Sequence, residues 1–377
     1  MKTRALATAA AAAAAIAIPS LAAASTSLSG GVWASYRYVT NSDFASPAFN
    51  QYLDEETGGD IGREALILYA DHTQDDGPWS LSAETRFGPG SFTDVANNST
   101  GDNFVIHKLW VGYDFSPDWK AYIGKSQVPF GWKTVNFWPG DLLMGGYGDQ
   151  MDVGGKVSGG FGNFGLSVAY YHQDDWGETS TDTVDDNRHW GSSTTYRKIQ
   201  TGVVDFNYTL QHGENSSSQF GISAQAGRLE DLSNLQGDCS DASGNPASCS
   251  GMDNGSHNAV ALYYQGQYGP ATAKAEVIRV NRDVPNMTND VKNTRYALEG
   301  GYAFGNWFAY LDATAATTDT DGNNADTVHA YAPGVRYDYG PGWFYVEYLK
   351  SDGDIGRNGD IYEADFDALY VTMDYYF

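Results

Sequence analysis

The chain has 377 residues, a net charge of −25 at pH 7, and aromatic residues at 14% of its length. So acidic a chain argues against a nucleic-acid partner, because the phosphate backbone binds basic surfaces. The aromatic content argues against disorder, since disordered chains have few of the apolar and aromatic residues that form a core.

Residues 1–24 have the pattern of a secretory signal peptide. Lys2 and Arg4 precede an apolar run that ends at Pro19, and the small residues 22–24 form an A-x-A cleavage site. A retained anchor helix is the alternative, but the run is short. No later apolar stretch approaches the roughly 20 residues that a spanning helix needs. We therefore expect export, with residues 25–377 forming one domain.

Segments that alternate apolar and polar residues recur along this domain, and we interpret each as a β-strand. Sixteen such segments are found, and an even number is what a bacterial single-chain barrel requires. The predicted fold class is all-β, a sixteen-stranded antiparallel transmembrane β-barrel. The predicted strands cover about 28–40, 62–72, 79–87, 103–115, 118–127, 150–160, 163–172, 196–209, 218–229, 257–268, 270–281, 293–304, 306–316, 327–339, 342–350 and 365–377.

The connections alternate in length. Every second one is short and contains turn residues, as in Gly162-Asn163 and Gly340-Pro341. Short periplasmic turns alternating with long extracellular loops are typical of outer-membrane barrels, whereas a soluble sandwich has no reason to keep this asymmetry. The predicted long loops carry most of the acidic residues and cover 41–61, 88–102, 128–149, 173–195, 230–256, 282–292, 317–326 and 351–364.

Alternation also predicts which charged side chains face the lumen. If Tyr296 and Leu298 face lipid, for example, Arg295 and Glu299 face inward. Charges of both signs in the lumen would orient polar solutes and set ion preference, although salt bridges that only hold the wall together are the alternative. The face of Lys125 is ambiguous. We expect the pore-lining or constriction residues to be Arg37, Glu84, Arg86, Lys108, Lys133, Asp141, Asp149, Asp152, Lys156, Arg295, Glu299, Arg336 and Asp338, with Lys274, Glu276 and Glu347 as weaker candidates.

The third long connection, about 128–149, is too apolar for a solvated loop, since it contains Trp132, Phe137 and Trp138. Non-helical backbone at membrane depth must be buried in protein or line a cavity, so we expect this loop to fold into the lumen. Packing over the barrel rim or against a neighbouring subunit is the alternative.

The sequence around this connection resembles a known family. Residues 122–131 read Y-I-G-K-S-Q-V-P-F-G, followed by N-F-W-P at 136–139, Asp149, and D-V-G-G-K at 152–156. This is similar to the V-P-F-G region of Gram-negative outer-membrane porins of the broad phosphate-selective O/P class. The resemblance implies a sixteen-stranded channel whose third loop narrows the pore. A dense arginine ladder is absent from this sequence, and the third loop offers only Lys133, so the resemblance does not extend to phosphate selectivity.

Cys239 and Cys249 lie in the polar loop 230–256. In an oxidising compartment we expect a disulfide that closes a small loop, with two free thiols as the alternative. Further on, Asp319, Asp321 and Asp326 surround Gly322 and supply the carboxylates of a possible surface calcium loop, but a solvated acidic loop fits the incomplete spacing as well. No other cofactor is expected.

The last predicted strand ends at Phe377 and alternates, with Leu369, Val371, Met373 and Tyr375 on the face of the terminal residue. A terminal aromatic residue on an apolar face is how outer-membrane barrels close.

We therefore expect an outer-membrane porin, a passive diffusion channel for small hydrophilic solutes and ions that weakly prefers cations. Outer-membrane lipid and lipopolysaccharide would surround it, and its size suggests a homotrimer. A substrate-selective channel for an anion, sugar or chelate is the nearest alternative. A surface hydrolase, for which His172 beside Asp174 and Asp175 is the only candidate, and a non-conducting structural barrel are less favoured. We expect no enzymatic activity.

Overall fold

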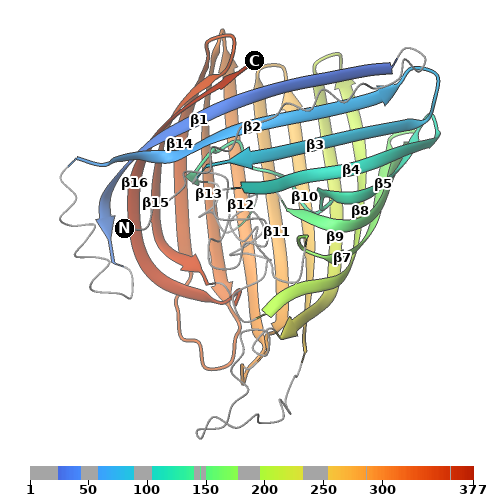
Figure 1. Ribbon diagram of the computed structural model, residues 1–377. Coiled ribbons are helices and arrows are strands. Elements are labelled where there is room, and N and C mark those ends of the chain that lie inside the picture. Colours follow the sequence, from blue (N-terminus) through green and yellow to red (C-terminus); the bar gives the residue numbers. More distant parts are fainter. Residues whose placement is uncertain are drawn as a thin grey trace, which may run out of the picture.

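The computed structural model describes residues 24–43, 58–88, 104–139, 145, 150–176, 196–231, 254–285, 287–356 and 358–377. Within these ranges the chain forms one closed antiparallel barrel of sixteen strands, in which each strand pairs with its neighbours in sequence and β1 pairs with β16 (Figure 1). The predicted fold class is confirmed. No helix in this part of the chain is long and apolar enough to cross a membrane. Residues 1–23 of the predicted signal peptide and the pair Cys239 and Cys249 lie outside the described residues, whereas Ala24, its predicted last residue, begins β1.

The strands agree closely with the alternating segments of the sequence. They are β1 (Ala24–Ser42), β2 (Asp60–Gln74), β3 (Trp79–Phe87), β4 (Phe104–Ser116), β5 (Trp119–Gln127), β6 (Met151–Phe161), β7 (Phe164–Gln173), β8 (Tyr196–Gly213), β9 (Ser216–Asp231), β10 (Gly255–Tyr268), β11 (Ala271–Asp283), β12 (Val291–Phe304), β13 (Trp307–Thr318), β14 (Val328–Asp338), β15 (Trp343–Ile355) and β16 (Ile361–Tyr376).

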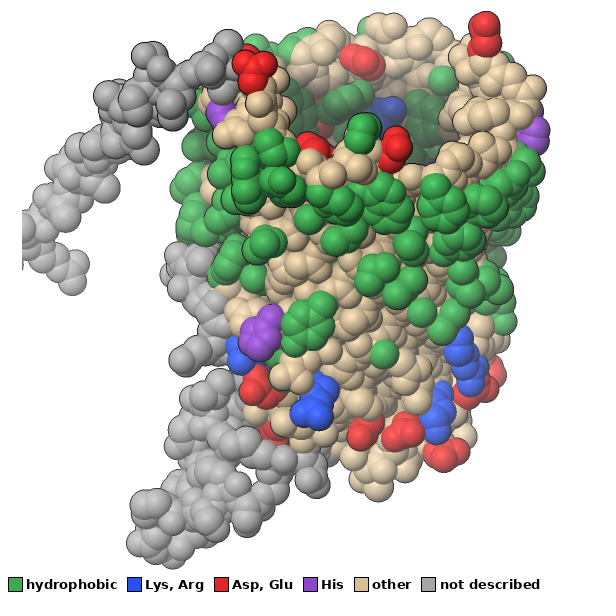
Figure 2. All heavy atoms as spheres, turned by 90° about the vertical axis from the view of Figure 1, so that its right-hand side faces the viewer, with side chains coloured by type: hydrophobic (Ala, Val, Ile, Leu, Met, Phe, Trp, Pro, Cys, Tyr) green, Lys and Arg blue, Asp and Glu red, His purple; other side chains and the backbone are tan. Residues whose placement is uncertain are grey.

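The two faces of the wall differ as alternation predicts. On β12, Tyr296 and Leu298 are 44% and 60% exposed, whereas Ala297 and Glu299 between and beside them are 1% and 3% exposed. On the face shown in Figure 2, hydrophobic side chains form a band across the upper part of the outer wall, with charged side chains below it and at the rim above it. An exposed apolar band around a closed barrel matches a lipid bilayer.

The short connections gather at one end of the barrel, here called the short-turn end, and the C-terminus lies at this upper end in Figure 1. Gly162, Gly269 and Gly305 take positive φ angles of 61°, 58° and 59° in these turns. Such angles suit glycine, which has no Cβ to clash. Gly30 and Phe377 exchange two backbone hydrogen bonds of 2.9 Å, so the final residue takes part in closing the barrel.

One predicted loop is largely strand. The connection predicted at 351–364 spans only residues 356–360, because β15 and β16 continue as a hairpin in which Gly353 pairs with Glu363 and Ile355 with Ile361. A register shift between Ser351 and Gly353 interrupts the ladder there. A bulge of this kind breaks strict alternation, which explains why the strand predicted from the sequence ended at residue 350 although β15 continues to Ile355.

A second bulge changes which residues of β4 face inward. Lys108 lies opposite Glu84 and Ile106 lies opposite Thr85, so His107 is an extra residue in β4. Unbroken alternation along β4 would place Val105 on the lipid face, but this side chain lies opposite Arg86 and is 1% exposed. The extra residue reverses the parity of the strand on one side of the bulge.

Candidate functional site

The segment 128–139, here called the inner segment, follows β5 and lies against the inner wall of the barrel. Val128 packs with Tyr171 on β7 and Val203 on β8. Phe130 packs against this group and against Ile278 and its buried neighbours on β10 and β11. Apolar side chains that would be costly to expose at membrane depth are thus buried against the wall.

The backbone of the inner segment turns at Gly131. This residue has a φ of 62°, and its N–H donates to Ser223 Oγ at 3.0 Å. A Cβ added here would collide with the carboxylate of Glu276. Two independent constraints therefore require glycine at position 131, namely the left-handed backbone conformation and the close approach to β11.

Two carboxylates on neighbouring strands hold the middle of the inner segment. Glu299 on β12 accepts a hydrogen bond from Val135 N at 2.9 Å. Asp312 lies directly opposite Glu299 on β13 and accepts from Thr134 Oγ1 at 2.8 Å and from Asn136 Nδ2. These three hydrogen bonds, made by neighbouring residues of the segment to buried side chains of the barrel, fix the segment to the wall.

A third carboxylate continues this attachment on β15. Glu347 Oε1 accepts from Phe137 N at 2.8 Å and from Tyr310 OH at 2.7 Å. Each of the acids that contact the segment is buried on the inner face. We call them the carboxylate row, which consists of Glu276, Glu299, Asp312 and Glu347.

Lys274 on β11 links the carboxylate row to the inner segment. Its Nζ lies 2.8 Å from Glu299 Oε1 and 2.6 Å from the carbonyl oxygen of Lys133, and 5.1 Å from the ring centre of Trp132. The side chain of Lys133 itself is exposed. The charge of Lys274 is therefore used to hold the segment in place.

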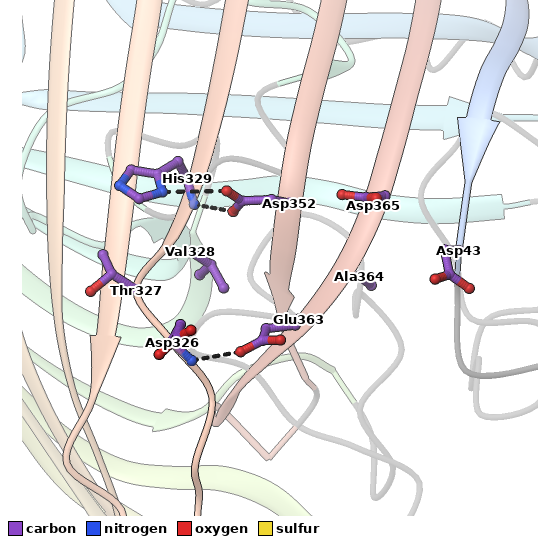
Figure 3. A pocket seen from close by; sticks show the side chains of 9 residues that line it. All are labelled: Asp43, Asp326, Thr327, Val328, His329, Asp352, Glu363, Ala364 and Asp365. Atoms are coloured by element: carbon purple, nitrogen blue, oxygen red, sulfur yellow. Dashed lines mark hydrogen bonds and ion pairs between the residues drawn. The ribbon is translucent and has the colours of Figure 1, made fainter.

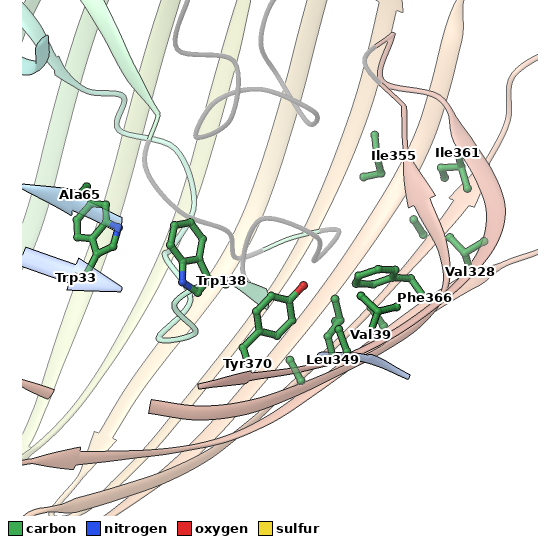
Figure 4. Packing of buried hydrophobic residues seen from close by; sticks show 14 of the residues in the cluster. Trp33, Val39, Ala65, Trp138, Val328, Leu349, Ile355, Ile361, Phe366 and Tyr370 are labelled. Carbon is green, nitrogen blue, oxygen red and sulfur yellow. The ribbon is translucent and has the colours of Figure 1, made fainter. Parts of the chain in front are cut away.

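The inner segment ends against β1. Phe137 and Trp138 lie 5.7 Å and 6.3 Å from Trp33, measured between ring centroids. Figure 4 shows Trp138 among the buried residues near Tyr370 and Leu349. Trp138 is 2% exposed. The contacts of the segment thus run along the wall from β7 past β15 to β1.

Several predicted lumen charges form pairs on the inner face. Glu84 and Arg86 share the inner face of β3, and Arg86 Nε lies 2.8 Å from Glu84 Oε1. Lys108 is half-buried and lies opposite Glu84. Arg37 is half-buried and lies opposite Tyr370, a residue of the inner core.

Asp152 on β6 is paired with a residue that the sequence analysis did not single out. Its Oδ2 lies 3.0 Å from Lys198 Nζ on β8, and both side chains are almost fully buried. Lys156, also on β6, donates to the carbonyl oxygen of Gln127 at 2.8 Å and lies over the Tyr122 ring at 4.9 Å. Alternation along β8 could have indicated Lys198, since it lies two residues from Tyr196, on the same buried face of the strand.

The remaining predicted residues lie apart from the inner segment. Arg295 is fully buried, and its Nε donates to Asn293 Oδ1 at 2.9 Å. Arg336 lies near the short-turn end, with its guanidinium 5.4 Å from the Phe308 ring centre and 5.7 Å from that of Trp343.

Asp338 is exposed at the end of β14, where its Oδ1 accepts from Gly340 N at 2.9 Å. This contact shapes a short turn. Asp141 and Asp149 fall outside the described residues.

The possible calcium loop does not bring its carboxylates together. Asp319 pairs with Arg279, and the carbonyl oxygen of Asp321 accepts from Asn289 Nδ2 at 2.7 Å. Within the described ranges, no group of three or more acidic, histidine or cysteine side chains is placed to hold a metal. A calcium ion at this loop stays a prediction.

Asp326 instead lines a hollow of about 540 Å³ at the long-loop end of β14–β16, where its N–H donates to Glu363 at 2.6 Å (Figure 3). His329 and Asp352 line the same hollow, with His329 Nδ1 lying 3.4 Å from Asp352 Oδ2. These acidic residues come from the loop before β14 (Asp326), from β15 (Asp352) and from β16 (Glu363).

Of the residues considered for a hydrolase, Asp175 is engaged by a lysine. His172 is exposed, whereas Asp175 is buried and its Oδ1 lies 2.8 Å from Lys125 Nζ. A nucleophile or base would have to lie within hydrogen-bonding distance of the histidine, and Asp175 is used elsewhere.

No family model matches the chain, and no curated protein sequence matches it. Solved structures do match. The outer membrane channel DcaP of Acinetobacter baumannii has a TM-score of 0.59 at 15% identity, with 94% of this chain and 97% of that one covered. An anion-selective porin from Comamonas acidovorans gives 0.54 at 14% identity, covering 94% and 100%. The trimer form of OmpT, an outer membrane protein of Vibrio cholerae, gives 0.58 at 12% identity, covering 94% and 100%. The chain has the barrel fold of these outer-membrane proteins.

Proposed function

We propose that the protein is an outer-membrane porin, a passive diffusion channel for small hydrophilic solutes and ions. The observation that carries this proposal is the attachment of the inner segment to the carboxylate row. Backbone that enters a barrel at membrane depth must be buried in protein or line a water-filled cavity. A segment held against one side of the wall narrows the lumen and leaves the opposite side for solutes.

The opposite side is bounded by β3–β6, which carry cationic side chains. Lys108 and Lys156 lie there, together with Lys120, which pairs with Asp114 at 3.3 Å. The carboxylates of Glu299, Asp312 and Glu347 across the lumen are engaged by the inner segment. Polar walls of mixed charge favour hydrated solutes over apolar ones.

We propose a weak preference for cations. The predicted long loops contain most of the acidic residues of the sequence, and their potential would act over about a Debye length, ~8 Å at physiological salt. Such a field enriches cations at the outer mouth, while the mixed charges of the lumen add little net selectivity. The preference should fade in 1 M salt, where the Debye length is about 3 Å.

The proposed function also indicates which molecules would surround the barrel in the outer membrane. Lipid would cover the exposed apolar band, and lipopolysaccharide would face the acidic long-loop end. We propose a homotrimer, which is supported by the trimer form of the similar OmpT barrel. The proposal assigns no enzymatic activity, and the engagement of Asp175 with Lys125 supports this.

The proposal is tested by recording single channels in planar bilayers with a salt gradient. We expect an ohmic pore whose reversal potential indicates weak cation selectivity. Absence of conductance from folded, inserted protein would overturn the channel. Strong anion selectivity would overturn the ion preference while leaving the channel in place.

A further inference from the structure

The lumen near the short-turn end contains a wall of uncharged hydrogen-bonding side chains. Thr209, Gln219, Gln265 and Lys274 lie directly opposite one another on β8–β11. Because Lys274 reaches Glu299 and the inner segment, this row faces the lumen. We call it the amide wall, which consists of Asn207, Thr209, Gln219, Gln265, Gln267 and Thr272.

The amides of this wall are ordered by one another. Gln265 Nε2 donates to Gln219 Oε1 at 3.0 Å, and Gln219 Nε2 donates to Asn207 Oδ1 at 3.1 Å. Gln219 and Gln265 border a hollow of about 260 Å³. Among the described residues that line this hollow, Lys274 alone is charged, and its charge is paired with Glu299 at 2.8 Å. The hollow therefore offers donors and acceptors without a free ionic charge.

Aromatic side chains continue the inner face beyond β12. Phe308 on β13 and Trp343 on β15 flank the guanidinium of Arg336 at 5.4 and 5.7 Å. Trp343 also lies 5.6 Å from Tyr376, which lies 6.4 Å from Tyr69 on β2. We call this set the aromatic belt, which consists of Phe308, Trp343, Tyr376 and Tyr69.

The aromatic belt faces the lumen, because each ring alternates with an exposed apolar neighbour on the outer face. Those neighbours are Trp307, Phe344, Tyr375 and Leu68, which are 44%, 38%, 43% and 44% exposed. Rings usually gather on the outer face of such barrels, at the membrane interfaces. Half-buried rings on the inner face are available to a solute.

The amide wall and the aromatic belt meet at Gly301 on β12. A Cβ at Gly301 would lie 2.7 Å from Thr272 Oγ1 and would collide with the Phe308 ring. Because this glycine has no side chain, Thr272 and Phe308 are neighbours across it. A solute at this point can reach the amides of β10 and the ring of β13 together. Figure 2 shows the upper mouth of the barrel as a hollow.

We propose that this junction binds neutral polyhydroxylated solutes of the sugar class. Hydroxyl groups would exchange hydrogen bonds with Gln265 and Gln267, while the C–H face of a sugar ring would pack on Phe308. The site rests on the proposed channel function and names its solute class. It would slow sugars at the inner mouth, beyond the reach of the acidic long-loop end.

The test uses maltose as the probe, in equilibrium dialysis against the detergent-solubilised full chain. We expect saturable binding, and Gln265→Ala and Phe308→Ala should each raise Kd about fivefold, as the loss of one hydrogen bond or ring contact does. Trp110→Ala is the matched control, because Trp110 contacts Tyr122 on the other side of the lumen, with ring centroids 4.9 Å apart. It should leave Kd unchanged. Heat-dependent mobility on denaturing gels checks that each variant is a folded barrel.

Absence of saturable maltose binding would overturn the site, as would equal loss of affinity in the Trp110→Ala control. Binding of gluconate in preference to maltose would also overturn it, since Arg336 would then be selecting an anion. Dialysis needs no conductance, so this test is separate from that of the channel. Binding without conductance would support the site and refute the channel, and conductance without binding would do the reverse.

Discussion

Replacing Asp312 with alanine should loosen the inner segment while leaving the barrel intact. Asp312 is 1% exposed and accepts hydrogen bonds from Thr134 Oγ1, at 2.8 Å, and from Asn136 Nδ2. Its strand pairs along its whole length with β12 and β14 through the backbone, which the substitution does not alter. The effect should therefore fall on the segment.

The free-energy cost of the Asp312→Ala substitution follows from the two hydrogen bonds that it removes. Each hydrogen bond contributes roughly 0.5–1.5 kcal/mol, and leaving the donors of Thr134 and Asn136 without an acceptor adds a desolvation cost, of which water in the lumen would remove part. A net cost of about 3 kcal/mol corresponds to about a hundredfold rise in the population of the detached segment. A segment that leaves the wall would enter the remaining lumen and interrupt the current.

Single-channel recording measures this directly, as the frequency of brief closures at fixed voltage. Asp374→Ala is the matched control, because Asp374 is also 1% exposed but accepts its hydrogen bond from Trp343 N at the short-turn end. We expect frequent closures in Asp312→Ala and wild-type gating in Asp374→Ala. Equal gating in Asp312→Ala and the wild type would refute the role given to the carboxylate row.

Further substitutions test other parts of the structure. Gly131→Ala should displace the inner segment, because alanine in the left-handed backbone conformation of Gly131 costs about 1–2 kcal/mol and its methyl group would collide with Glu276. Unchanged single-channel conductance would contradict this prediction. Lys198→Met should lower the free energy of unfolding, measured in urea, by about 3–5 kcal/mol, because it removes the cation that pairs with buried Asp152. Adding Asp152→Leu should restore most of this loss. An unchanged urea midpoint in Lys198→Met would argue against the pair. Cys239→Ser with Cys249→Ser should still fold and conduct while loop 230–256 becomes easier to proteolyse, given about 3 kcal/mol for closing a small loop; free thiols in the native protein would exclude the disulfide.

The strands could be predicted because each strand that crosses the bilayer must place apolar side chains toward lipid and polar side chains toward the lumen, so that the two kinds of residue alternate along it. The limits of the strands and the faces of their side chains were predicted wrongly where a single extra residue breaks the two-residue alternation. The extra residue His107 turns Val105 inward, and the shift between Ser351 and Gly353 hides the continuation of β15. His107 is not a residue type that marks a bulge, so only the pairing of strands reveals the bulge in β4, whereas Gly353 inside β15 is a residue type that can mark one.

The inner segment illustrates a different limit. Its apolar composition indicated that it enters the barrel, but not which wall it follows. Phe137 and Glu347 are far apart in sequence, and alternation shows only that Glu347 faces inward. Asp312 was not singled out, although its position between Leu311 and Ala313 places it on the inner face. The partners of such residues depend on the closed shape of the barrel.

The central claim, that the inner segment narrows a water-filled pore, is tested most directly by deleting residues 132–146 and comparing single-channel conductance with that of the full chain. The account predicts that the deletion variant forms the barrel, conducts more current and admits larger solutes, because the material that narrows the lumen is gone. Unchanged conductance from an intact barrel would contradict the account and place the constriction elsewhere.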